Sequence, residues 1–96
     1  MKNIVTNAYI FTDKKGLKRL FAEVLESAKY PTGHHIVTSD IVEEDLQNGV
    51  IKTYTGSVYY VQKFLDSESF KSYVLDKYDK NSANYYLYVV GLGELK

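Results

Sequence analysis

The side chains that could act as nucleophiles, proton carriers or metal ligands are few and scattered. His34 and His35 are the only histidines. Neighbouring side chains of a strand point to opposite faces of a sheet, so these two cannot easily share one ion. A zinc or hydrolytic site needs three converging ligands, and the chain has no cysteine and no third histidine. We therefore predict no catalytic residue, no metal site and no cofactor, with one histidine at the surface and the other satisfied by partners.

A cluster of four cations lies early in the chain: Lys14, Lys15, Lys18 and Arg19. We expect them in the first turns of a helix, where cations oppose the helix dipole. Exposed amides beside lysines suit a phosphate group. Two interpretations stay open: solvated helix positions, or a site for nucleotide or nucleic-acid phosphate, including a sponge for a signalling nucleotide.

The opposite charge gathers in a second cluster of four acids: Asp40, Glu43, Glu44 and Asp45. We expect them beside the tip of a β-hairpin. One interpretation is that they keep the tip soluble and block pairing between sheet edges. The other is that carboxylates beside tyrosines imitate phosphates beside bases, so that the hairpin competes for a basic groove on a target protein.

Tyrosine is the most over-represented side chain, with ten copies and no tryptophan. In each of the pairs Tyr59-Tyr60 and Tyr85-Tyr86, one ring should face the core and the other should face solvent. Outward tyrosines offer a rigid contact area with a polar tip, which favours binding to proteins or to stacked bases. We therefore include Tyr54, Tyr59 and Tyr60 among the expected binding residues, although a low-GC genome also enriches tyrosine.

The elements that must position these residues follow from the hydrophobic pattern. Residues 3–11 are typical of a strand. In residues 17–28 the apolar positions recur at the helical period, which predicts an amphipathic helix: Leu17, Leu20, Phe21, Val24, Leu25 and Ala28. Residues 35–42, 50–55 and 57–63 are typical of strands. Asn48-Gly49 indicates a type I′ turn, and Thr55-Gly56-Ser57 a second turn or a bulge.

A second helix of about a dozen residues should begin at Asp66 or Ser67 and bury Phe70, Tyr73, Val74 and Tyr78. After a polar loop, residues 85–90 are apolar on both faces, which is typical of a central strand. The predicted fold is α+β, one domain over residues 1–96, in the order β-α-β-β-β-α-β. We expect a mainly antiparallel sheet with two helices on one face.

One stretch, Thr38-Ser39-Asp40-Ile41-Val42 with Asn48–Thr53 and Thr55-Gly56-Ser57-Val58-Tyr59, resembles a β-meander found in short bacteriophage proteins. In those proteins a T-S-x-I-V strand is followed by an acidic or glycine turn and a T-x-[ST]-G-S-x-Y strand. The resemblance covers about 25 residues. Some small phage proteins of this kind are anti-defence factors, including anti-CRISPR proteins, so the resemblance implies an inhibitor of a host protein.

Composition limits the remaining classes of function. Twelve basic and twelve acidic residues cancel, whereas proteins dedicated to duplex DNA are usually basic. No apolar run approaches the length of about 18 residues needed to span a membrane. We expect a cytoplasmic, non-enzymatic protein that binds a host protein and forms a homodimer through a tyrosine-bearing strand in residues 50–63. Nucleotide or nucleic-acid binding is the alternative function.

Overall fold

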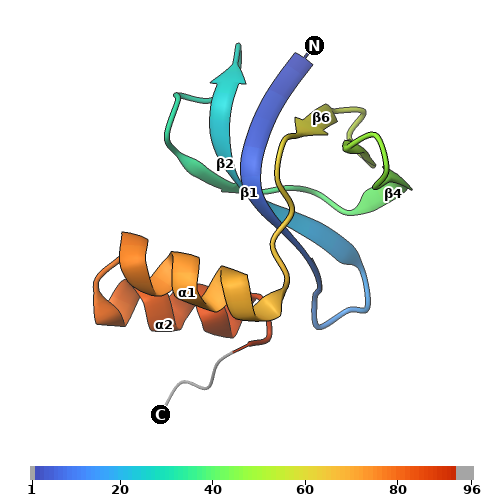
Figure 1. Ribbon diagram of the computed structural model, residues 1–96. Helices are drawn as coiled ribbons and strands as arrows, with labels where there is room; N and C mark the ends of the chain where they lie inside the picture. Colours follow the sequence, from blue (N-terminus) through green and yellow to red (C-terminus); the bar gives the residue numbers. More distant parts are fainter. Residues whose placement is uncertain (1, 93–96) are drawn as a thin grey trace.

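The computed structural model describes residues 2–92, which form six strands followed by two helices (Figure 1). In chain order the elements are β1 (Lys2–Thr12), β2 (Lys18–Ser27), β3 (His35–Val37), β4 (Ile41–Asp45), β5 (Val50–Thr53), β6 (Val58–Val61), α1 (Ser67–Lys77) and α2 (Lys80–Val89). The α+β class is therefore correct. The predicted order of elements is wrong, because one predicted helix is a strand and one predicted strand is a helix.

The six strands form one sheet in the order β3-β2-β1-β6-β5-β4. Neighbouring strands are antiparallel except for β1 and β6, which are parallel. The sheet curls, so that its edge strand β4 returns to the vicinity of β2. There the Lys18 Nζ and a Glu44 carboxylate oxygen lie 3.1 Å apart. The strand order leaves β3 and β4 as the two edge strands.

The segment predicted as the first helix is the turn before β2 and the strand itself. Leu20, Phe21 and Ala22 are consecutive, and all three are buried. This pattern belongs to a strand that is covered on both faces. Phe21 packs with the helices, whereas Leu20 and Ala22 pack on the opposite side of the strand. Pairing with β1 and β3 thus overrides the helical spacing of the apolar residues.

The reverse error concerns the predicted central strand over residues 85–90: residues 85–89 lie in α2, and Val90 is its C-cap. The polar segment before them, predicted as a loop, supplies the helix N-cap: an Asp79 carboxylate oxygen accepts a hydrogen bond of 2.8 Å from the Ser82 amide. The buried positions of this region are spaced by four and three residues, as on one face of a helix: Ala83, Leu87 and Val90. Capping and this stripe outweigh the strand preference of its aromatic and β-branched residues.

Helix α1 confirms its prediction. Asp66 is the N-cap and accepts a hydrogen bond of 2.8 Å from the Ser69 amide. The predicted apolar face is the packed one, with Phe70 and Val74 fully buried. Both helices pack against β1 and β2, and they lie side by side in Figure 1. This helix-side cluster consists of Phe11, Phe21, Phe70, Val74, Ala83, Leu87 and Val90.

A second apolar cluster fills the concave side of the curled sheet. It joins the opposite side of β1 and β2 to β5 and β6, through Val5, Ala8, Leu20, Ala22, Ile51 and Tyr59. A bulge in β1 lets this strand contribute side chains to both clusters. The pairing with β2 slips between Thr6 and Tyr9, where Asn7 has a φ of 49°. An extra residue in a strand reverses which face the later side chains occupy, so Phe11 turns towards the helices.

The region of residues 35–63 departs from its prediction in three ways. The single strand expected over residues 35–42 is divided into β3 and β4, which lie at opposite edges of the sheet. The hairpin between β4 and β5 has a longer loop than a type I′ turn, because Asp45 pairs with Val50. Within that loop only Gly49 has a positive φ, of 70°. The acids Glu43, Glu44 and Asp45 therefore lie in β4 itself. The second turn, at Gly56, agrees with its prediction.

The strand predicted to pair with a second copy of the chain is also internal. Strands β5 and β6 each have a neighbour on both sides, so neither offers a free edge. The edge strand β4 is short and carries charged side chains, and its pairing with β5 slips between Ile41 and Glu43. Short, charged and bulged edges are features that discourage pairing between sheets.

The exchange of helix for strand at residues 17–28 leads to a clear mutational test. Phe21 is 1% exposed, and replacing such a phenylalanine by alanine costs about 3 to 5 kcal/mol. Leu17, which a helical stripe would bury, is 40% exposed, so Leu17→Ala should cost less than about 1 kcal/mol. Urea denaturation of both variants measures the two costs. Equal losses would contradict the strand and restore the helix.

Candidate functional site

The basic cluster lies in and beside the tight turn between β1 and β2, not in a helix. Asp13 organises this turn: one carboxylate oxygen accepts the amides of Lys15 (2.9 Å) and Leu17 (3.0 Å). The other oxygen accepts from Arg19 Nε at 2.8 Å. The bond from Arg19 is the main reason that the pKa of Asp13 lies below its usual value. The predicted phosphate site at a helix N-terminus is therefore wrong in its location.

Three of the four predicted cations nevertheless line one pocket, of about 320 Å³, which we call the turn–helix pocket. Its wall is completed by the end of α2, and its lining residues are Asp13, Lys14, Lys15, Arg19, Tyr88 and Val89. The Lys14 ammonium donates to the Tyr88 hydroxyl at 3.0 Å and lies 5.0 Å from the centre of that ring. Lys18, the fourth cation, points instead to Glu44 across the curled sheet.

The four acids do not form a uniform negative surface. Glu44 is paired with Lys18, and the Glu43 carboxylate lies 3.0 Å from Lys52 Nζ. Asp45 is used within the hairpin loop, where it accepts from the Asn48 amide and side chain. Asp40 precedes β4, where its carbonyl accepts from the Tyr54 amide. Exposed ion pairs are weak. Two of the four acids nevertheless have a lysine beside them, so the local net charge is smaller than the −4 that the sequence indicates.

Strand pairing places two of these acids on one face of the sheet with a predicted tyrosine. Cross-strand neighbours form a row over five strands, from β2 to β4: Glu26, Ile4, Tyr60, Val50 and Asp45. Lys52 and Val58 pair beside this row, and Glu43 pairs with Lys52. Ile4, Val50 and Val58 are partly exposed and Tyr60 is 39% exposed. We call this surface the outer sheet face.

The predicted tyrosines divide between core and surface. Tyr59 is buried in the concave cluster, which removes it from the predicted binding residues, while its neighbour Tyr60 faces outwards. Tyr54 is 75% exposed in the turn after β5. Tyr85 is exposed and Tyr86 is packed against the helix-side cluster. The expectation of one inward and one outward ring therefore holds for both pairs, although the second pair lies on a helix.

Sequence reasoning missed a chain of hydrogen bonds that joins β2, β3 and α1. The Tyr73 hydroxyl donates to Glu23 Oε1 at 2.5 Å and lies 2.6 Å from His35 Nε2. The Tyr78 hydroxyl contacts the other ring nitrogen, Nδ1. Asn7, at the bulge of β1, donates to the same Glu23 oxygen at 3.1 Å. These residues are distant in sequence, so only the prediction of one exposed and one satisfied histidine pointed towards this network.

The bonding pattern determines the proton positions in this network. Because Tyr73 gives its proton to Glu23, its oxygen accepts from His35 Nε2–H, which leaves Nδ1 to accept from Tyr78. His35 is then neutral. Burial lowers the pKa of His35, and the Tyr73 hydrogen bond lowers the pKa of Glu23. Burial also raises the pKa of Tyr78 to about 12. All three changes favour the same arrangement of a carboxylate, neutral phenols and a neutral imidazole.

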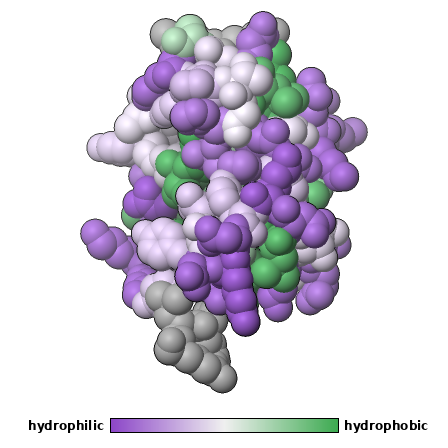
Figure 2. Space-filling model, turned by 90° about the vertical axis from the view of Figure 1, so that its left-hand side faces the viewer, coloured by the Kyte–Doolittle hydropathy of each residue, from purple (hydrophilic) through white to green (hydrophobic). Residues whose placement is uncertain are grey.

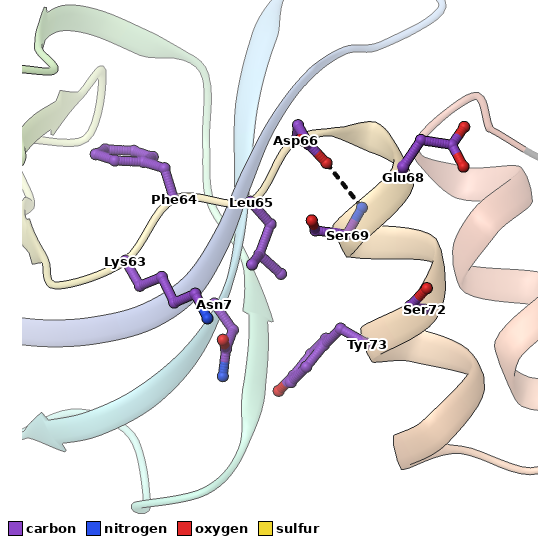
Figure 3. A pocket seen from close by; sticks show the side chains of 9 residues that line it. All are labelled: Asn7, Lys63, Phe64, Leu65, Asp66, Glu68, Ser69, Ser72 and Tyr73. Carbon is purple, nitrogen blue, oxygen red and sulfur yellow. Dashed lines mark hydrogen bonds between the residues drawn. The ribbon is translucent and has the colours of Figure 1, made fainter.

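A larger pocket, of about 480 Å³, adjoins this network at the start of α1 (Figure 3). Tyr73 reaches from the helix towards Asn7 of β1, while the Ser69 amide is already bonded to Asp66. Asp66 and Glu68 outnumber the single cation of the lining, Lys63. A third pocket, of about 290 Å³, is apolar and lies beside the exposed Leu46. Neither pocket matches a group of residues predicted from the sequence.

The surface seen in Figure 2 is mainly hydrophilic, with apolar side chains in separate spots. Among residues 2–92, no three His, Asp or Glu side chains gather as metal ligands would. None of the helices described in this range has the length and apolar character needed to cross a membrane. Searches of protein-family models, curated proteins and solved structures find no match to this chain.

The hydrogen-bond network predicts how stability depends on pH. The folded pKa of His35 lies below the unfolded value of 6.5, so the unfolded chain binds the proton first as pH falls. The stability contribution of His35 is complete above pH 6.5 and decreases below it. Urea denaturation at several pH values between about 5 and 7.5 should show this loss in the wild type and in His34→Gln, and a flatter profile in His35→Gln. A slope that depends on His34 instead would contradict the network.

Proposed function

We propose that this protein acts without catalysis, by binding another protein through the outer sheet face. The observation that carries the proposal is the cross-strand row in which Tyr60 lies between Ile4 and Val50. A tyrosine flanked by aliphatic side chains is typical of the energetic centre of an interface. The ring of Tyr60, which is 39% exposed, supplies a large and rigid contact area to such a centre.

The charges around this row indicate the chemistry of the partner. Glu26 and Asp45 stand at its two ends, and Glu43 lies in the neighbouring row. Among the side chains that the structure describes in these two rows, Lys52 is the cation, and it is paired with Glu43. An apolar centre with a mostly acidic rim suits a partner that presents an apolar group surrounded by lysine and arginine. Such a rim mainly accelerates association and selects the partner.

The resemblance to short bacteriophage proteins extends this proposal to a biological setting. The partner is then a host protein in the cytoplasm, and a basic groove on a nucleic-acid-handling defence protein has the required chemistry. The stretches that carry the resemblance overlap β4, β5 and β6, which form a three-stranded meander. Val50 of the outer sheet face lies within these stretches, and Tyr60 directly follows them on β6.

A pair of tyrosine variants tests this proposal. Immobilised wild-type protein should retain a stoichiometric partner from bacterial host lysate. Tyr60→Ala should weaken the complex by about 30-fold, the effect of losing about 2 kcal/mol at an interface centre. Tyr85→Ala is the matched control, because Tyr85 is 56% exposed but lies on α2. Calorimetry with the recovered partner measures both affinities.

The outcome is decided by the difference between the two variants. Equal affinities of Tyr60→Ala and wild type would remove the outer sheet face from the interface. Equal losses in both variants would indicate a general effect on folding, which urea denaturation measures separately. Self-association is followed in the same samples by light scattering, where a mass above the 11.0 kDa of one chain would identify a homodimer.

A further inference from the structure

The turn–helix pocket lies at the opposite end of β1 from Ile4 and has a different chemistry from the outer sheet face. We propose that it binds a nucleotide-type phosphate monoester, with the phosphate held by Lys14 and Lys15. The ring of the ligand then packs against Tyr88 and Val89, which form the wall supplied by α2. This site is independent of the proposed protein interface.

The charge of the lining favours a dianion. Three cations and one acid line the pocket, which gives a net charge of +3 − 1 = +2. The acid, Asp13, already accepts two amides and Arg19 Nε. The negative charge of Asp13 is therefore directed into the turn. Among the described lining residues Asp13 is the one carboxylate, and its ion pair is with Arg19 and not with Lys14 or Lys15. A phosphate monoester carries about −1.5 to −2 charges at neutral pH, which nearly neutralises the net charge of +2 of the lining.

Two of the three cations that line the pocket, Lys14 and Arg19, are already held in place. Lys14 is kept in place by the Tyr88 hydroxyl and ring, and an ammonium has three donors, of which this contact uses one. Arg19 is fixed by two bonds, from Nε to Asp13 and from Nη1 to the Thr38 carbonyl at 3.0 Å. Two anchored cations lose less conformational entropy on binding than free side chains do.

The other two pockets lack this combination of size, charge and aromatic wall. The pocket beside α1 has two acids and one lysine in its lining, so it repels an anion. The apolar pocket has no charged lining residue. The turn–helix pocket, of about 320 Å³, is within the size range of small-ligand sites, which begins at about 300 Å³. Of the three pockets described, it alone has a positive lining with an aromatic ring.

An NMR titration with AMP, adenosine and inorganic phosphate tests the proposal on the full chain. AMP should shift the amide signals of Lys15 and Leu17 and the ring signals of Tyr88. Adenosine alone and phosphate alone should each bind at least about 10-fold more weakly, since each lacks one part of the ligand. The affinity for AMP should rise between about pH 5 and 7.5, because the second ionisation of a phosphate has a pKa of about 6.

Two double variants with the same change of charge separate a site from general attraction. Lys14→Gln with Lys15→Gln should weaken AMP binding at least about 10-fold. Lys29→Gln with Lys80→Gln should leave it unchanged; Lys29 also lies over a tyrosine ring, that of Tyr30, but outside the pocket. Equal effects of the two double variants would overturn the proposal, as would phosphate binding as tightly as AMP. Tyr60→Ala should bind AMP like the wild type, which keeps this result separate from the protein interface.

Discussion

The antiparallel pairing of β1 with β2 is the interaction on which the rest of the structure depends. These two strands are the longest, and they are covered on both sides: by the helices on one side and by the curled part of the sheet on the other. A sheet of this size with only one covered face would leave Phe21 or Leu20 in water. The exposed side chain would then lose the roughly 1.5 to 3 kcal/mol of stabilisation that burial provides. The two apolar clusters therefore stabilise each other through one shared pair of strands.

The bulge at Asn7 makes this two-sided arrangement possible. Without an extra residue, Val5, Tyr9 and Phe11 would all face the same side of β1. The bulge instead gives Val5 and Ala8 to the concave cluster and Phe11 to the helix-side cluster. Asparagine tolerates the positive φ at this point better than most residues do. The Asn7 side chain also donates a hydrogen bond to Glu23, so the bulge that divides the core also holds the carboxylate of the partly buried network.

The sequence predicts this fold well where the signal is local and poorly where an element depends on distant partners. Helix α1 was predicted from its cap and spacing, and the turn at Gly56 from its glycine. The strand β2 was mistaken for a helix because LFAEVL satisfies the helical period, and only its distant partners β1 and β3 reveal that both faces are covered. The basic cluster was identified as a group, but its shape depends on Tyr88, which comes from a helix that was predicted as a strand. Similarly, no local pattern brings Glu23, His35 and Tyr73 together.

The helix-side face of β2 explains how one strand serves two chemistries at once. Arg19, Phe21 and Glu23 alternate along it and point to the same side. Arg19 belongs to the positive turn–helix pocket, Phe21 to the apolar cluster, and Glu23 to the network with Tyr73. The buried ring of Phe21 separates a paired cation from a paired carboxylate, so neither has to satisfy the other. Arg19 therefore bonds to Asp13 in the turn, and Glu23 bonds to Tyr73 of α1. Because Glu23 is kept away from the turn–helix pocket, the lining of that pocket keeps its positive charge.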